Sequence, residues 1–199
     1  ANIDAMKQLG VTDVLSFSSV GSFKEKLSPG TFILIDQYID MTKHRESTFF
    51  DDDIVVHVSM ANPVDETLMQ VSEYALNELS LSFNKGGSYI CIEGPQFSSK
   101  LESKIYQNWD CDVIGMTSIP EAKLCKEASL RYVNIGMITD YDCWHPNYDA
   151  VEVSSVINTL SENAKNAKMV IIKFLSKYME ISFKENQNSL NSLVTPRDK

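Results

Sequence analysis

YVNIGMITDYDCW, residues 132–144, is an apolar run followed directly by two aspartates, Asp140 and Asp142. An apolar run bounded by polar residues is typical of a buried strand. Residues i and i+2 of an extended chain lie on the same side, so we expect both carboxylates to face one pocket while Tyr141 faces away. Burial and a neighbouring acid both raise the pKa of a carboxyl group. The stretch therefore predicts a proton donor at the end of a buried strand.

Predicted helices and strands alternate around this strand, which favours an α/β fold with helices on the faces of a sheet. Helices are expected at 2–10, 64–79, 98–109 and 119–128, and strands at 11–19, 31–36, 86–94 and 111–116. The last helix is the clearest, because apolar residues recur at spacings of three and four: Val153, Val156, Leu160, Ala164, Ala167, Ile171 and Phe174. The segment 40–62 is expected to be irregular. We expect one domain over 1–183 and a frayed polar tail over 184–199.

Composition excludes several classes of function. The chain of 199 residues is 43% hydrophobic and carries a net charge of −9, which fits a globular protein and opposes binding to nucleic acid or to an anionic membrane. No apolar run approaches the ~18 residues of a membrane span, and residues 1–10 do not resemble a signal peptide. Four cysteines without a CxxC pair are expected to be reduced, as in the cytoplasm. A small, mostly neutral ligand is the expected partner.

Four predicted strands end in small or polar loops, SFSSVGS, EGPQFSS, GMTSIPE and TDYDCW, where α/β folds collect ligands. Each loop also has a structural interpretation. Residues 18–22 could form an ordinary turn, Thr117 could cap a helix, and Phe97 could belong to the core. Asp140 and Asp142 could each cap a helix or pair with a cation. A metal site is not expected, since His145 is the only nearby histidine and Trp144 has no ligand role.

Several longer stretches resemble one known family: EGPQFSSKLES (93–103), residues 113–145, residues 150–168 and residues 10–40. They look like the 5′-methylthioadenosine phosphorylases of the trimeric purine nucleoside phosphorylase family, from Ala1 to about Lys177. The resemblance implies an α/β fold with a central mixed sheet, partly barrel-like and flanked by helices, in a homotrimer with sites at subunit boundaries. It also implies phosphorolysis that releases adenine, with inorganic phosphate as co-substrate and no cofactor or metal.

The resemblance implies a role for each matching residue. Asp140 would protonate N7 of the leaving purine and accept a hydrogen bond from the 6-amino group, with Asp142 holding it in place. Phe97 would pack on the purine and Met116 would lie under the ribose. Phosphate would be bound by three residues, of which the first two occupy the family's Thr-Ala phosphate loop: Ser18, Ser19 and Thr117. A methylthio pocket would be lined by Val153, Val156 and, from the neighbouring subunit, His57.

Two positions favour adenine over 6-oxopurines. Relatives that act on 6-oxopurines carry Asn where this chain has Asp140, and Glu where it has Ser98. An ionised Asp accepts from a 6-amino group and repels a 6-oxo group, although a protonated Asp could also donate. The chain departs from the family in other places: the phosphate loop differs at three positions (Phe17, Ser19 and Val20), and Gly115 replaces a common Asn.

About the first quarter of a typical family member has no counterpart in these residues. That quarter holds a GGTG-like turn and an RHG segment, which supplies an Arg and a His to phosphate. Half of the phosphate site would then be missing, which leaves open whether the 199 residues are active by themselves. Three alternatives stay open: a purine-binding paralogue without turnover, a nucleosidase that uses water, and a phosphorylase with broader or 6-oxopurine specificity. The preference for a methylthio or hydroxyl group at the 5′ position also stays open.

Overall fold

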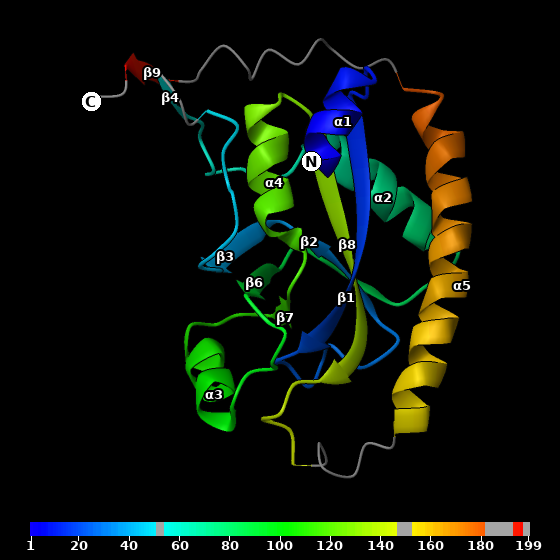
Figure 1. The fold of residues 1–199 in the computed structure, drawn as a ribbon. Helices are drawn as coiled ribbons and strands as arrows, with labels where there is room; N and C mark the ends of the chain where they lie inside the picture. Colours follow the sequence, from blue (N-terminus) through cyan, green and yellow to red (C-terminus); the bar gives the residue numbers. More distant parts are fainter. Residues whose placement is uncertain (51–53, 147–152, 182–192, 197–199) are drawn as a thin grey trace.

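A seven-stranded mixed sheet runs through the middle of the molecule (Figure 1). The computed structural model describes residues 1–50, 54–146, 153–181 and 193–196, without the side chains of 153–156 and 193–196. Its strand order is β3-β6-β7-β1-β8-β2-β5, with β7–β1 and β8–β2 antiparallel and the other neighbours parallel. The expected α/β class and mixed, partly barrel-like sheet are confirmed. The strand bounds are β1 Asp13–Ser22, β2 Phe32–Ile35, β3 Gln37–Met41, β5 Phe83–Lys85, β6 Ser88–Ile92, β7 Val113–Gly115 and β8 Arg131–Tyr141.

Helices cover both faces of the sheet. Helices α1 (Asn2–Gln8) and α4 (Ser118–Glu127) share one buried core, and α2 (Glu66–Glu78) and α5 (Val153–Tyr178) share a second. Helix α3 (Lys100–Asn108) packs in a third, smaller core with β6 and β7. Side chains that the sequence places at helix starts cap two of these helices, Asp65 for α2 and Ser99 for α3. Within the described ranges, none of the helices has the length and apolarity that crossing a membrane requires.

Strand β8 is buried on both faces, and this explains its nearly unbroken apolar sequence. Tyr132 and Ile138 pack in the core under α1 and α4, whereas Val133 and Ile135 pack in the core under α2 and α5. This alternation is the period of two that an extended strand imposes. Asn134 is also fully buried, and its amide contacts Ser118 of α4. Strand β8 therefore carries one polar side chain into a buried layer.

Two short strands lie where the sequence predicted none. Strand β4 (Ile54–His57) lies in the segment expected to be irregular, and β9 (Leu193–Pro196) lies within the expected frayed tail. The two pair antiparallel in a separate sheet (Figure 1). Strands β3 and β5 were also missed. With three to five residues each, these strands are too short for an alternating pattern to stand out.

The buried face of α5 differs from the predicted one. Ala167 and Phe174 are buried as expected, but Leu160, Ala164 and Ile171 are exposed. Asn163 is buried instead, because its side-chain amide donates to the Ile138 carbonyl oxygen at 3.0 Å. A polar residue with a strand carbonyl as partner can take an interior position, which turns the helix away from the face that apolar residues alone predict. The side chains of Val153 and Val156 lie outside the described part.

Candidate active site

A β-bulge at the end of β8 turns its carboxylates toward β1. Val20 pairs with Ile138 and Gly21 with Asp140, so one extra residue, Thr139, is inserted on β8. The Thr139 hydroxyl donates to a carboxylate oxygen of Asp140 at 2.6 Å. Bulges locally bend a strand and re-aim its side chains. The bulge therefore sets the direction of the Asp140 carboxylate.

Asp140 and Asp142 lie on one side, as the sequence predicted. A methyl group placed on Gly21 would lie 3.4 Å from Oδ2 of Asp140 and 3.7 Å from Cβ of Asp142. The backbone N–H of Asp142 donates to the Ser22 carbonyl, which extends the pairing with β1 past the end of β8. Both acids thus lie over the same short segment of β1.

The surroundings of Asp140 favour its neutral form. Burial raises the pKa of Asp140 most strongly, the hydrogen bond from Thr139 lowers it, and the charge of Asp142 raises it, with a net increase. Asp142 is 6% exposed, and both its carboxylate oxygens accept from the Ser98 hydroxyl, at 3.0 and 3.1 Å. A raised pKa suits a carboxyl group that donates a proton near neutrality. The predicted direction of the pKa shift is confirmed.

A pair of hydroxyls lies where β7 meets β1. The antiparallel register that pairs Gly21 with Ile114, continued by three residues, sets Ser18 opposite Thr117. Their oxygens are 3.2 Å apart, although 99 positions separate them in the sequence. Ser18 lies within β1, so the prediction that Ser18 and Ser19 belong to a loop is wrong. Because β7 runs antiparallel to β1, the segment that follows β7 lies beside the middle of β1.

Tyr89 supports the backbone of Thr117. The Thr117 N–H donates to the Tyr89 phenol oxygen at 3.2 Å. A methyl group placed on Gly115 would lie 2.0 Å from that same oxygen, far inside a van der Waals contact. The phenol therefore occupies the space that a side chain at position 115 would need. This contact explains why position 115 of this chain is glycine.

Arg45 holds the segment after β7 from the other side. Its guanidinium donates to the carbonyl oxygens of Met116 at 2.7 Å, Ile119 at 2.5 Å and Glu93 at 2.9 Å. Carbonyl groups near the ends of two strands thus accept hydrogen bonds from one cation. Hydrogen bonds from a charged donor are stronger than those between neutral groups. Arg45 links the segment after β6 to the segment that carries Thr117.

The remaining expected site residues are spread over the structure. Phe97 is 78% exposed, so the core interpretation of this residue is wrong. Met116 lies against Gly94, where an added methyl group would be 2.6 Å from the Met116 sulfur. Ser19 is exposed beside the buried Ser18. His57 is exposed at the end of β4, which lies at the opposite end of β8 from Asp140 (Figure 1).

Sequence reasoning missed three supporting residues: Asn134, Tyr89 and Arg45. Asn134 could have been noticed as the one amide inside an apolar strand. Tyr89 could have been linked to the unusual Gly115 only with the sheet order in hand. Arg45 lies in a polar stretch whose composition carries no signal. Among the described residues, no group of three or more histidines, cysteines or carboxylates is arranged to hold a metal ion.

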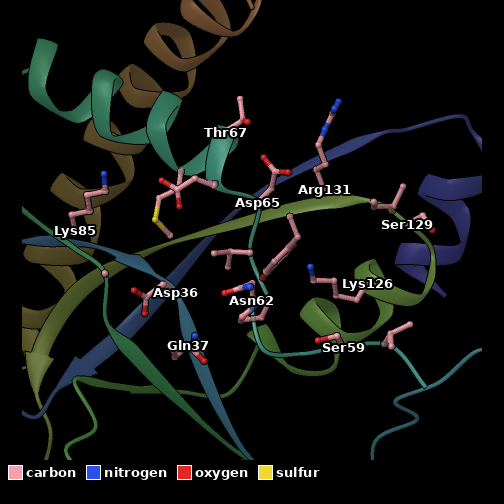
Figure 2. A pocket seen from close by; sticks show the side chains of 18 residues that line it. Asp36, Gln37, Ser59, Asn62, Asp65, Thr67, Lys85, Lys126, Ser129 and Arg131 are labelled. Atoms are coloured by element: carbon pink, nitrogen blue, oxygen red, sulfur yellow. The ribbon is translucent and has the colours of Figure 1, made fainter. Parts of the chain in front are cut away.

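A separate cavity of about 820 Å³ lies at the other end of the sheet (Figure 2). None of the expected site residues that the structure describes lines it. Several of its charged groups have partners: Lys85 pairs with Glu73 at 2.7 Å, and Arg131 pairs with Asp13. Asp65, which faces the cavity in Figure 2, already caps α2 by accepting the Leu68 N–H at 2.9 Å. These groups serve the fold, and the candidate site is the one beside Gly21.

A mixed sheet that brings two aspartates and a hydroxyl pair to three adjoining strands, β7, β1 and β8, defines a fold of the nucleoside phosphorylase class. The chain belongs to the phosphorylase superfamily, whose pattern matches residues 1–176.

Sequence relatives are named S-methyl-5′-thioadenosine phosphorylase. The one from Rhodospirillum rubrum is 50% identical over 171 residues, which are 86% of this chain and 58% of the relative. The one from Thermosynechococcus vestitus is 42% identical over 204 aligned positions, which cover 100% of this chain and 70% of the relative. The chain spans 58% to 61% of the length of the first three curated relatives.

Solved structures of similar fold carry related names. A methylthioadenosine phosphorylase from an Antarctic soil metagenomic library superimposes with a TM-score of 0.91 at 42% identity, covering 96% of this chain and 68% of that one. A mutant of the Schistosoma mansoni adenosine/methylthioadenosine phosphorylase, in complex with methylthioadenosine, gives 0.86 at 30% identity, covering 92% of this chain and 70% of that one.

Proposed function

We propose that the chain carries the purine side, and part of the phosphate side, of an enzyme that splits 5′-methylthioadenosine with inorganic phosphate. The products are adenine and 5-methylthioribose 1-phosphate. One observation carries the proposal. The Thr117 hydroxyl lies 3.2 Å from the hydroxyl of Ser18 on β1, and the two aspartates lie beside Gly21 of the same strand. Donors for an anion and an acid for a purine thus share one short segment of sheet. The names of the relatives support this substrate.

Asp140 is the catalytic acid in this proposal. A purine leaves poorly as an anion, so a proton delivered to N7 lowers the barrier as the bond from C1′ to N9 breaks and its electron pair moves to the purine. Burial and the charge of Asp142 raise the pKa of Asp140 and keep a proton available. After transfer, the ionised carboxylate accepts from the 6-amino group of adenine. Asp142, fixed by Ser98, stabilises this arrangement.

Phosphate is the nucleophile in this proposal. One of its oxygens forms the new bond to C1′ on the face opposite the departing purine. Thr117 is exposed and Ser18 lies directly behind it, so Thr117 contacts the anion and Ser18 supports it. The exposed Ser19 offers a backbone N–H at the same place. Inorganic phosphate is the only co-substrate, and we propose that no cofactor or metal is used.

The rest of the pocket follows the same proposal. Phe97, largely exposed in a single chain, is free to stack on the purine. Met116 lies under the ribose, and Val153 and Val156 line the methylthio pocket. His57 completes that pocket from a neighbouring subunit, because β4 and the carboxyl end of β8 lie at opposite ends of one chain (Figure 1). In line with the trimeric family that the sequence resembles, we propose a homotrimer in the cytoplasm, with residues 1–183 of each chain as one domain.

Two contacts support adenine as the base. Asp140 replaces the Asn that suits a 6-oxo group, and Ser98 replaces a Glu. Ser98 donates to both oxygens of Asp142, so it keeps that carboxylate as an acceptor. An acceptor pair suits a 6-amino group, which has only hydrogens to offer.

Adenine release from 5′-methylthioadenosine, followed by chromatography with and without phosphate, tests the proposal. We expect release only with phosphate, together with 5-methylthioribose 1-phosphate. Equal release without phosphate would mean hydrolysis by water. Adenine binding in calorimetry without release under either condition would mean a binding protein. Adenosine and inosine in the same assay give the preference at the 5′ position and at the base.

A further inference from the structure

The hydroxyl pair of the proposed phosphate site continues into the protein interior. Ser18 is 5% exposed and also lies 3.3 Å from the Ser118 hydroxyl, which is fully buried. Behind both lies Asn134, with no exposed surface. Its side-chain nitrogen is 2.6 Å from the Ser118 oxygen and 3.0 Å from the Ser18 oxygen. A chain of polar groups thus runs from a buried amide to the exposed Thr117.

The direction of these hydrogen bonds follows from counting donors. The Asn134 amide has two hydrogens and three oxygens within reach: Ser118 at 2.6 Å, Ser18 at 3.0 Å and the Tyr132 phenol at 3.3 Å. The two shorter contacts are to the serines, so we assign the two hydrogens to Ser118 and Ser18, which accept from them. The Asn134 oxygen has no partner among the described residues. Turning the amide over would leave two donors without acceptors in place of one acceptor without a donor, which costs more. The orientation with the nitrogen toward the serines is therefore favoured.

Because Ser18 and Ser118 accept from Asn134, their own hydrogens are not used on residue 134 and stay available to donate outward, toward Thr117. Three hydroxyls, on Ser18, Ser118 and Thr117, have three hydrogens but make only two contacts with one another. Ser118 can donate to Ser18, and Ser18 to Thr117. The third hydrogen then belongs to Thr117, the exposed residue of this network, and its acceptor is either the neighbouring Tyr89 phenol oxygen or, when bound, the anion. An outward donor is what a phosphate dianion needs.

We propose that Asn134 is a positioning residue for phosphate: its buried amide orients the serine hydroxyls so that Thr117 presents a hydrogen to the anion. This inference rests on the proposed function and adds a residue that does not touch the substrate. It also accounts for a fully buried amide in a strand that is otherwise apolar. A side chain at position 134 that only accepts hydrogen bonds would draw the serine hydrogens inward. The hydrogen bonds between the three hydroxyls would then run in the opposite direction, and Thr117 would have no outward hydrogen.

Asn134→Asp is the sharpest test when it is measured on the alkaline side of neutrality, because the ionised Asp has nearly the same shape and no donor, whereas burial favours the protonated acid, which keeps one. Isothermal calorimetry with inorganic phosphate measures the Kd, and steady-state kinetics measure the KM for phosphate and for 5′-methylthioadenosine separately. We expect Asn134→Asp to raise the Kd and KM for phosphate at least tenfold and to leave the KM for the nucleoside within about twofold. Asn134→Ala, which removes the donors without adding an acceptor, should raise the phosphate values by a smaller factor.

Asn163→Asp is the matched control, because Asn163 is equally buried and donates to the Ile138 carbonyl of the same strand. It should lower thermal stability like Asn134→Asp but leave phosphate binding unchanged. Should Asn134→Asp not fold, Asn134→Ala alone decides. Wild-type phosphate affinity in the Asn134 variants, or an equal loss in Asn163→Asp, would overturn the inference while the proposed function stands.

A second measurement tests whether Asn134 acts through the serine. In a Ser18→Ala background, Asn134→Ala should have little further effect on the KM for phosphate, because the group it orients is gone. Fully additive losses would contradict the proposed route. A wild-type chain that binds no phosphate and releases adenine with water would overturn the proposed function and this inference together, and the wild-type measurement by itself shows that outcome.

Discussion

The pKa and the direction of the Asp140 carboxyl group depend both on the neighbouring sequence and on burial. The acid follows an apolar strand, so it is held at the edge of the core, where desolvation raises its pKa. Thr139, Asp142 and Ser98 then set its direction and its electrostatic surroundings. The sequence predicted that both acids lie at the end of a buried strand and that they face the same side. The bulge at Thr139 could not, because it appears only when the pairing of β8 with β1 is known.

Asp140→Asn tests the role of the acid in catalysis. The amide cannot deliver a proton to N7, so we expect kcat/KM for 5′-methylthioadenosine to fall by a factor of about 10² to 10⁴. Turnover of inosine should be spared or improved, since Asn can donate to a 6-oxo group. Steady-state kinetics on both nucleosides measure the ratio. Equal losses on both substrates would remove Asp140 from its role in base selection.

The same substitution has a predictable effect on stability. A carboxyl whose pKa is raised in the folded state contributes stability that is fully present below its unfolded pKa and is lost as the pH rises through its folded pKa. Asn does not titrate. The melting temperature of Asp140→Asn relative to the wild type should therefore increase as the pH rises above the ordinary value of 3.8, and then level off. Thermal melts across the acidic range measure this difference.

Asp40→Asn supplies a control of opposite sign. Burial raises the pKa of Asp40, but hydrogen bonds from Lys123 and Thr42 outweigh it and leave the pKa lowered. Its stabilising contribution is present above the ordinary pKa and is lost as the pH falls through the lowered one. Asp40→Asn should thus lose stability relative to the wild type as the pH rises. If the melting temperature relative to the wild type changed with pH in the same direction for the Asp140 and Asp40 variants, the opposite pKa shifts assigned to the two residues would be contradicted.

At the scale of elements, the packing of β6 on β7 decides where Thr117 lies. Tyr89 fills the space above Gly115 and accepts the Thr117 N–H. The caps, glycines and apolar runs that marked most helices and strands are local signals, and most of those elements could be predicted. The exact buried face of α5 could not, because it depends on the contact between Asn163 and a carbonyl of β8. The short strands β3, β4, β5 and β9 were not predicted either, since their pairing partners are distant in sequence.

Gly115→Ala tests the contact between these strands. The added methyl group would lie 2.0 Å from the Tyr89 oxygen, so we expect a loss of at least about 1–3 kcal/mol in the free energy of unfolding. Urea denaturation measures the loss. In a Tyr89→Leu background the phenol is absent, and Gly115→Ala should cost clearly less. Strictly additive costs in this double-mutant cycle would show that the two positions do not compete for space.

At the scale of the whole molecule, the position of His57 argues for assembly. Strand β4, which ends at His57, and the carboxyl end of β8, which carries Asp140, lie at opposite ends of one chain (Figure 1). A pocket that used both residues would therefore need two chains. We expect light scattering to give three times the mass of one chain. A monomer that is fully active at low concentration would contradict this view.

Mixing two defective chains tests the shared site directly. His57→Ala should lower kcat/KM for 5′-methylthioadenosine by about tenfold, because the methylthio pocket loses one wall. Co-expression of His57→Ala with Asp140→Asn creates some sites that have Asp140 from one chain and His57 from the other. Their activity should exceed the sum of the two separate variants. Activity equal to that sum would place His57 outside the site.

Local features of the sequence determined the order of the main elements, the α/β class and the acids at the end of a buried strand, because each depends on residues close together in the chain. Tertiary structure alone decided which polar groups meet. The approach of Ser18 to Thr117 across 99 positions depends on strand order and register. The burial of Asn134 behind them depends on how α4 packs on β8. Such contacts are set by the packing of the whole sheet, so no short stretch of sequence contains them.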